Sequence, residues 1–171
     1  VTYTVIQITG EKPVRTTEDI MITDSYVKSG SKVITVADAS EFKVGDLICI
    51  MRPSSEEWVK AMNMKDVVTV YGDKVSWQKN MVNTKSERTI TAINGNQITL
   101  DYGVYVPYER KYTESYIYRM DDSGRIHDVG VENLRVLSYF NGDPLDNNHA
   151  KMAITAFRAK NIFVRNVTAK N

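Results

Sequence analysis

Cysteine is almost absent from this sequence of 171 residues, in which Cys49 stands alone. A single thiol excludes both a disulfide within the chain and a metal–thiolate cluster. Because Cys49 lies in the apolar run 46–50, we expect it to be a small buried side chain. No apolar run approaches the ~18 residues that a membrane-spanning helix requires, so the sequence predicts no membrane span.

The chain also lacks an excess of charge of either sign. It contains 22 Lys and Arg against 21 Asp and Glu, for a net charge of +1, and the charges are scattered. This pattern argues against a nucleic-acid partner or an acidic-lipid surface. Phosphate-binding glycine motifs, the His-Glu-x-x-His motif and the Gly-x-Ser-x-Gly elbow are missing as well, which disfavours nucleotide-dependent and serine-hydrolase chemistry. An initiator Met and a signal peptide are also missing, so we expect a mature or excised segment.

Long helical patterns are missing, and what the chain has instead is a repeat near its end. Residues 130–136 and 163–169 are alike: Val131 matches Val164 and Asn133 matches Asn166, a spacing of 33 residues (164 − 131). A polar run of ten residues, 141–150, interrupts that spacing and leaves 23 (33 − 10). Solenoid repeats have roughly 20–30 residues in one coil, so the spacing predicts stacked coils.

The repeated segments have the pattern of short strands. Residues 151–157 alternate between apolar and other side chains, and residues 161–164 are β-branched and aromatic. Asn133, Asn161 and Asn166 border these strands, where asparagine adopts the left-handed backbone that a strand-to-strand corner needs. Such short strands must stack on a neighbouring coil. The sequence therefore predicts an all-β, right-handed, single-stranded parallel β-helix, with Val131 and Val164 at equivalent levels of one core.

Two stretches also carry a family resemblance. Residues 130–135, Asp143-Pro144, Asp146, His149 and 152–155 resemble the bacterial pectate-lyase-like (pectin-lyase-like) β-helix proteins, which are associated with polysaccharide utilisation, as do residues 52–62. The resemblance covers the chain from about Ser29 onward and implies activity on polysaccharides. In that family an acidic residue is expected at position 148 and an aromatic residue, usually tryptophan, at position 151. Asn148 and Lys151 depart from this pattern, which implies either a changed specificity or a loss of activity.

The remainder of the chain is read from local patterns. We expect leading strands in residues 1–28, the first coil strands and a short helix in 29–64, an excursion in 65–120 and regular coils in 121–171. Ser55 is placed as the N-cap of a helix over 56–64, and Asn94-Gly95 predicts a hairpin. The whole is expected to form one β-helix domain. Because no polar capping segment follows the last coil, we expect it to be a fragment of a longer solenoid.

The interrupting loop supplies the candidate catalytic residues. His149, Lys151 and Asp146 are predicted to act on an anionic sugar, with Asp146 orienting His149 or helping to hold a cation such as Ca²⁺. Asp143 and Asn148 are predicted substrate contacts. A lyase needs a base and a group that neutralises the uronate carboxylate, whereas a glycoside hydrolase needs two carboxylates. The alternative is that these Asx residues only form turns.

Other candidate contacts lie outside the loop. Trp77 is a candidate for sugar stacking or for anchoring its own loop, and Trp58 for capping the solenoid or binding sugar. Arg125 and His127 are further candidate substrate contacts, although a solvated corner also explains them.

The predicted function is that of a secreted, periplasmic or cell-surface bacterial protein that acts on a polysaccharide along the coil, as a lyase or a glycoside hydrolase. The alternative is a non-catalytic module, either a glycan-binding adhesin or a piece resembling a phage tailspike. A monomer is favoured over a trimer.

Overall fold

The computed structural model describes residues 4–146 and 148–170, which divide into two compact units. Unit 1 comprises the N-terminal segment up to Val14 together with residues from Asp122 onward, and unit 2 comprises Arg15–Asp121. Unit 2 is thus inserted, in sequence, within unit 1. The sequence analysis expected one continuous β-helix domain, and the insertion has no signature in local periodicity because both units are built of short strands.

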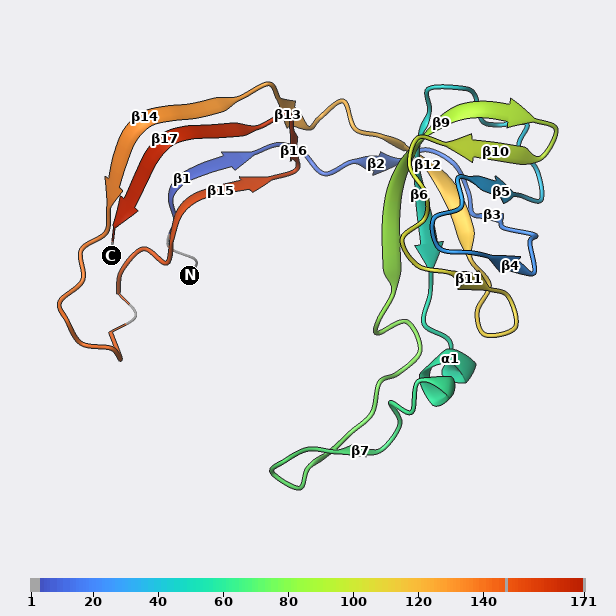
Figure 1. The fold of residues 1–171 in the computed structure, drawn as a ribbon, viewed down its shortest axis with the longest axis horizontal. Helices are drawn as coiled ribbons and strands as arrows, with labels where there is room; N and C mark the ends of the chain where they lie inside the picture. The colour runs from blue at the N-terminus through green and yellow to red at the C-terminus, as the bar shows by residue number, and fades with distance from the viewer. Residues whose placement is uncertain (1–3, 147, 171) are drawn as a thin grey trace. The chain divides into compact units, whose positions relative to one another are not determined.

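Unit 1 contains parallel strand pairs. Its strands are β1 (Thr4–Thr9), β13 (Ile126–His127), β14 (Gly130–Leu137), β15 (Met152–Phe157), β16 (Ala159–Lys160) and β17 (Phe163–Lys170). β1 pairs with β15, β13 with β16, and β14 with β17, all in parallel (Figure 1). The described strands therefore form two rungs: rung 1 is β1, β13 and β14, and rung 2 is β15, β16 and β17.

The register within unit 1 confirms the predicted repeat. Val131 pairs with Val164, and the amide of Asn166 donates to Oδ1 of Asn133 at 2.8 Å. Asn133, Asn161 and Asn166 all have a positive φ, of 56°, 54° and 50°, as predicted for corner residues. The strand order of the two rungs is that of a parallel β-helix, whereas a longer right-handed solenoid stays a prediction.

Burial in unit 1 differs between the rungs. Val131 is 9% exposed, but Val164 directly beside it is 53% exposed. Val131 is covered by the second rung, while β17 pairs with β14 in the described sheet and has no further strand beyond it. Because Val131 and Val164 pair in register in a parallel sheet, both side chains lie on the same face, as expected, whereas a closed core over Val164 stays a prediction.

β1 was expected to be a leading strand and is instead the first strand of rung 1. Thr4 pairs with Met152, a separation of 148 residues (152 − 4). The other parallel pairs are separated by 33 residues, as between Ile126 and Ala159. The excess of 115 residues (148 − 33) corresponds to the insertion that carries unit 2.

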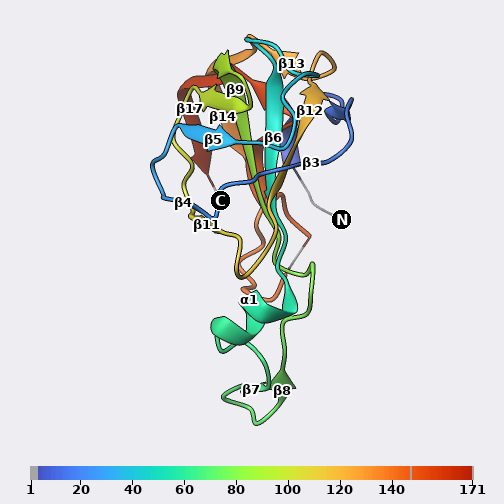
Figure 2. The ribbon, with the colours of Figure 1, turned by 90° about the vertical axis from the view of Figure 1, so that its right-hand side faces the viewer.

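Unit 2 is built mainly on antiparallel strands. They are β2 (Val14–Arg15), β3 (Ile20–Met21), β4 (Tyr26–Val27), β5 (Val33–Thr35), β6 (Leu47–Arg52), β7 (Val67–Val68), β8 (Lys74–Val75), β9 (Thr84–Asn94), β10 (Gln97–Leu100), β11 (Tyr108–Glu109) and β12 (Tyr116–Asp121). The main sheet has the order β2-β12-β6-β9-β10-β5, with β3 also on β12. β4 with β11 and β7 with β8 form separate pairs (Figure 2).

The main sheet of unit 2 closes on itself. Ile22, which follows β3, bridges Val36, which follows β5. Backbone hydrogen bonds from Thr23 to Thr35 and from Ala37 to Met21, both 2.9 Å, complete this seam. Residues 29–64 were expected to begin the parallel coils, but β5 and β6 pair antiparallel with β10, β9 and β12. Alternating strands fit either arrangement, so periodicity alone could not separate the two.

The hydrophobic core lies inside this closed sheet. Among the least exposed side chains are Ile34, Ile48, Ile90, Ile98 and Ile117. Ile34, Ile90 and Ile98 lie between more exposed neighbours along their strands, as expected when one face of a sheet is buried, whereas β6 is buried at four consecutive positions, 48–51. Cys49 is buried as predicted, and burial raises the pKa of its thiol.

Two local predictions in unit 2 are confirmed. Helix α1 (Glu56–Ala61) begins at the N-cap Ser55, whose Oγ accepts a hydrogen bond from the backbone N–H of Trp58 at 2.9 Å. β9 and β10 form the predicted hairpin, with Asn94 paired to Gln97. Gly95 has a φ of 55° and is the first of the two loop residues, a position where a two-residue hairpin turn favours glycine. In Figure 1, α1 and β7 extend away from the main sheet of unit 2.

Candidate functional site

The loop that follows β14 is held by turn chemistry. Oδ1 of Asn141 accepts from the backbone N–H of Asp143 at 2.8 Å, and Oδ1 of Asp143 accepts from that of Leu145 at 2.9 Å. Oδ1 of Asp146 accepts from the N–H of Asn148 at 2.8 Å. The aspartates of the predicted site thus use their carboxylates to fold the loop, and Asn147, which follows Asp146, lies outside the described residues.

His149 and Lys151 have separate surroundings. The His149 ring lies edge-on to Phe140, with 5.5 Å between ring centroids, and its buried Nδ1 has no hydrogen-bond partner among the described residues. Lys151 instead lines a small cavity of about 210 Å³ with Lys170. No group of three or more His, Cys, Asp or Glu side chains in the described part of the chain is placed to hold a metal ion. The described residues therefore provide no ligand set for the Ca²⁺ ion that Asp146 was predicted to help hold.

A charged cluster lies where β13 and β16 pair. Nδ1 of His127 is 2.6 Å from Oδ2 of Asp128, and the amide of Asn161 donates to Oδ1 of Asp128 at 3.1 Å. The hydrogen bond from His127, followed by that from Asn161, lowers the pKa of Asp128. Nζ of Lys160, which pairs in register with His127, lies 2.9 Å from Asp122.

Arg125 belongs to the same corner, because its NH1 lies 3.9 Å from Oδ2 of Asp122. The structure thus brings the two predicted contacts Arg125 and His127 into one cluster. Sequence reasoning missed Asp128 and Lys160, and the 33-residue spacing between Asp128 and Asn161 was the available signal.

The tryptophans of unit 2 stack on one another. The ring centroids of Trp58 and Trp77 are 5.9 Å apart and their planes differ by 8°. The guanidinium carbon of Arg52 lies 4.8 Å from the centroid of the Trp58 ring. The backbone N–H of Trp77 donates to the carbonyl of Met64 at 2.9 Å. Trp77 therefore anchors its loop to Met64 in the segment that follows α1, and anchoring was one of its two predicted roles.

Trp77 also lines a pocket of about 630 Å³, which is relevant to its other predicted role, sugar stacking. The lining residues are Glu56, Glu57, Val59, Lys60, Lys65, Ser76, Trp77, Gln78 and Lys79. Three lysines against two glutamates give the lining a net charge of +1 (3 − 2). Hydrogen bonds from its own backbone N–H and from Ser55 lower the pKa of Glu57, which is therefore ionised at neutral pH. Sequence reasoning missed the lysines because they come from α1 and from two separate parts of the following loop.

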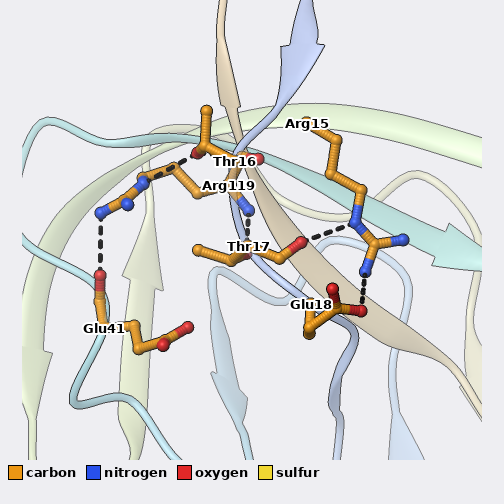
Figure 3. A pocket seen from close by; sticks show the side chains of 6 residues that line it. All are labelled: Arg15, Thr16, Thr17, Glu18, Glu41 and Arg119. Carbon is orange, nitrogen blue, oxygen red and sulfur yellow. Dashed lines mark hydrogen bonds and ion pairs between the residues drawn. The ribbon is translucent and has the colours of Figure 1, made fainter.

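A second cleft in unit 2, of about 620 Å³, is polar (Figure 3). Nε of Arg119 donates to Oγ1 of Thr16 at 3.0 Å, and NH1 donates to the carbonyl of Glu41 at 2.9 Å. Arg15 contacts Glu18 and donates from Nε to the carbonyl of Thr17 at 2.6 Å. These guanidinium groups join β2 and β12 to the loop that carries Glu41. The two arginines of this cleft therefore connect neighbouring segments of unit 2, which is a structural role. The sequence did not predict this cleft because Arg15 and Arg119 lie far apart in the chain.

Comparison with known proteins gives structural likenesses only. No protein-family model and no curated protein matches the chain, so the resemblance to pectate-lyase-like proteins stays a prediction. Similar solved structures include the tailspike gp61 of Pseudomonas phage phi297 (15% identity over 96% of this chain, TM-score 0.49). Another is the gp54 tailspike of Acinetobacter baumannii phage AP22, solved in complex with a capsular saccharide (12% identity over 94% of this chain, TM-score 0.41). A third is the tailspike gp49 of Pseudomonas phage LKA1 (16% identity over 90% of this chain, TM-score 0.40).

The chain spans 22%, 24% and 22% of the lengths of these three tailspike chains. In the described residues, no helix is long and apolar enough to cross a bilayer.

Proposed function

We propose that this chain binds an acidic polysaccharide in the pocket lined by Trp77. The observation that carries the proposal is an indole ring, held from behind by the stacked Trp58, in a pocket with a net positive lining. The proposal selects the non-catalytic alternative of the sequence analysis. It also fits the predicted location outside the cell, where such polymers occur.

The chemistry of the pocket matches a sugar ring that bears a carboxylate. One face of a pyranose presents C–H groups, which pack against the electron-rich face of an aromatic ring. Lys60, Lys65 and Lys79 supply positive charge for the carboxylate, while Ser76 and Gln78 can exchange hydrogen bonds with hydroxyl groups. A volume of about 630 Å³ lies within the ~300–1,000 Å³ range of ligand pockets.

The lowered pKa of Glu57 argues against a role for this residue as the general acid of a hydrolase. A glycoside hydrolase needs a carboxylic acid whose pKa is raised, so that it still holds a proton near neutral pH. The pKa of Glu57 is lowered instead, by hydrogen bonds to its ionised form. Its carboxylate is therefore suited to accept hydrogen bonds from sugar hydroxyl groups.

The binding test compares tryptophan and tyrosine variants. Trp77→Ala should weaken binding to polygalacturonate by about 10- to 100-fold, which corresponds to roughly 1.4–2.7 kcal/mol of stacking and packing. Trp77→Phe should retain part of the affinity. Tyr71→Ala removes a 90% exposed aromatic side chain that does not line the pocket and should leave affinity unchanged. Calorimetric titrations in which Trp77→Ala binds as well as the unmodified chain would refute the proposal.

One observation favours a second candidate, polysaccharide lyase activity in unit 1. The contact between His127 and Asp128 orients the imidazole as a base, with Nε2 directed away from Asp128. Such a base could remove the proton alpha to a uronate carboxylate. The predicted trio His149, Lys151 and Asp146 receives no comparable support from its contacts. Time-resolved absorbance of unsaturated product from polygalacturonate should vanish in His127→Ala, and absence of product from the unmodified chain would exclude this candidate.

A further inference from the structure

Helix α1 separates the Trp77 pocket from a second cavity of about 400 Å³. Glu56, Glu57 and Lys60 line the first pocket, whereas Trp58, Ala61 and Met62 line the second. At 3.6 residues per turn, Glu56 and Lys60 share one face of α1, and Trp58 and Ala61 share another that lies nearly half a turn away, so the two cavities lie on different sides of α1. The stacked tryptophans continue this wall, since Trp77 lines the first pocket and Trp58 lines the second.

The two cavities differ in their chemistry. The second cavity is bordered mainly by apolar and aromatic side chains, namely Trp58, Met62, Pro107 and Tyr112. Its charged lining residues are Arg52 and Glu109, which give a net charge of zero (1 − 1). A free carboxylate therefore prefers the Trp77 pocket, whereas a neutral group with a small apolar part fits the second cavity.

Arg52 gives the second cavity a hydrogen-bond donor. NH2 of Arg52 donates to Oγ1 of Thr84 at 3.1 Å, and the guanidinium lies over the Trp58 ring. A guanidinium carries five N–H donors in a fixed plane. Contact with Trp58 and Thr84 holds this plane at the edge of the cavity, where it can donate to a carbonyl oxygen.

We propose that the second cavity binds an acetyl group carried by the same polysaccharide, so that the chain selects an acetylated acidic glycan. This inference rests on the proposed function of the Trp77 pocket. The acetyl methyl packs against Met62 and Tyr112, and the acetyl carbonyl accepts a hydrogen bond from Arg52. An O-acetyl ester and an N-acetyl amide share this chemistry.

The experiment measures affinity for matched polymers by calorimetry with the full chain. One pair is an O-acetylated polyuronate before and after mild alkaline deacetylation. The other is an alternating N-acetylhexosamine–uronate polymer before and after N-deacetylation. We expect about 4- to 10-fold tighter binding of the acetylated form in at least one pair, from burial of one methyl group and one hydrogen bond. The pair that shows the preference identifies the source of the acetyl group.

A substitution separates this inference from the proposed function. Met62→Asp alters a half-exposed side chain of the second cavity and should lower the affinity for the acetylated polymer to that of the deacetylated one. Met81→Asp alters an exposed methionine outside both cavities and should change neither affinity. Equal affinity for the two forms, or an equal loss for both in Met62→Asp, would overturn the acetyl site even if Trp77→Ala still weakens binding. Absence of binding to every polymer would overturn the proposed function itself.

Discussion

Unit 1 and unit 2 are both built of short strands, yet they bury their side chains to different extents. Of the twenty buried hydrophobic side chains in the described residues, all but Ile8, Val131 and Val136 belong to unit 2. The closed sheet of unit 2 surrounds its core, whereas the two rungs of unit 1 cover each other on one side only. Closure of a sheet, more than the number of strands, thus decides how much apolar surface leaves water.

The largest expected difference between the units concerns core truncation. Ile98→Ala removes a side chain that is 0% exposed in unit 2 and should lower the free energy of unfolding by about 2–5 kcal/mol. Val164→Ala in unit 1 should cost less than about 1 kcal/mol, because Val164 is already half exposed. Urea unfolding followed by tryptophan fluorescence reports on unit 2, which holds both tryptophans, and far-ultraviolet circular dichroism reports on both units. A Val164→Ala cost close to that of Ile98→Ala would show that rung 2 is covered in solution.

Two ion pairs extend the comparison to charged groups. Arg119→Ala leaves the carboxylate of Asp46, whose side chain is 7% exposed, without the guanidinium 3.6 Å away, and should cost about 1–3 kcal/mol. Arg165→Ala removes the partner of Glu132, bonded through Nε at 2.8 Å on an exposed surface. That variant should cost at most about 1 kcal/mol. Thermal unfolding of both proteins checks the order, and equal costs would contradict the role of burial.

In unit 1, which lacks a closed core in the described residues, we expect the left-handed backbone at the corner asparagines to contribute to stability. Asn166→Val places a β-branched residue at a φ of 50° and should cost about 1–2 kcal/mol. Asn166→Gly retains the backbone conformation and loses only the amide bonded to Asn133, so its cost should be below about 1 kcal/mol. Chemical denaturation of the two variants measures the difference. A more destabilised glycine variant would assign the stability to the amide contact instead.

The smallest expected effect is the titration of Asp128. The lowered pKa means that stability from its contacts is present above the ordinary value near 3.8 and is lost as pH falls through the lower folded pKa. His127→Ala should raise the pKa of Asp128 more than Asn161→Ala does, because the His127 bond is the larger cause. Asp38 of unit 2, whose pKa is lowered by Ser40, is the matched control and should not respond. Carboxyl carbon chemical shifts measure both groups, and an unchanged Asp128 would contradict the His127 contact.

Local features were predictable from sequence because their causes are local. The left-handed corners at Asn133 and Asn166, the Ser55 cap and the turn at Gly95 each depend on one residue type and its neighbours. The 33-residue register between Val131 and Val164 was accessible because both copies of the repeat are present. By contrast, the closed sheet of unit 2 depends on pairing between distant strands, which alternation does not specify.

The candidate site was predicted only in part, for a similar reason. Trp77 was selected as an aromatic residue in an irregular segment, but its stacking on Trp58 and the lysines around it depend on how the loop folds back on α1. His149 and Asp146 were selected from a loop whose polar residues prove to form turns. The residue types that shape a loop are the same ones that do chemistry, so composition alone cannot separate these roles.

The pairing of β1 with β15 has a consequence for the order of folding. β1 is synthesised before its partner by 148 residues, and closing a loop of that length costs about 1.3 kcal/mol more than closing one of 33 residues. Once unit 2 has folded, the bond from the N–H of Thr16 to the carbonyl of Arg119, at 2.9 Å, holds the two ends of the insertion together. Folding of the insertion thereby shortens the loop that β1 must close. We therefore expect β1, although it precedes unit 2 in the chain, to gain its hydrogen bonds to β15 only after unit 2 has folded.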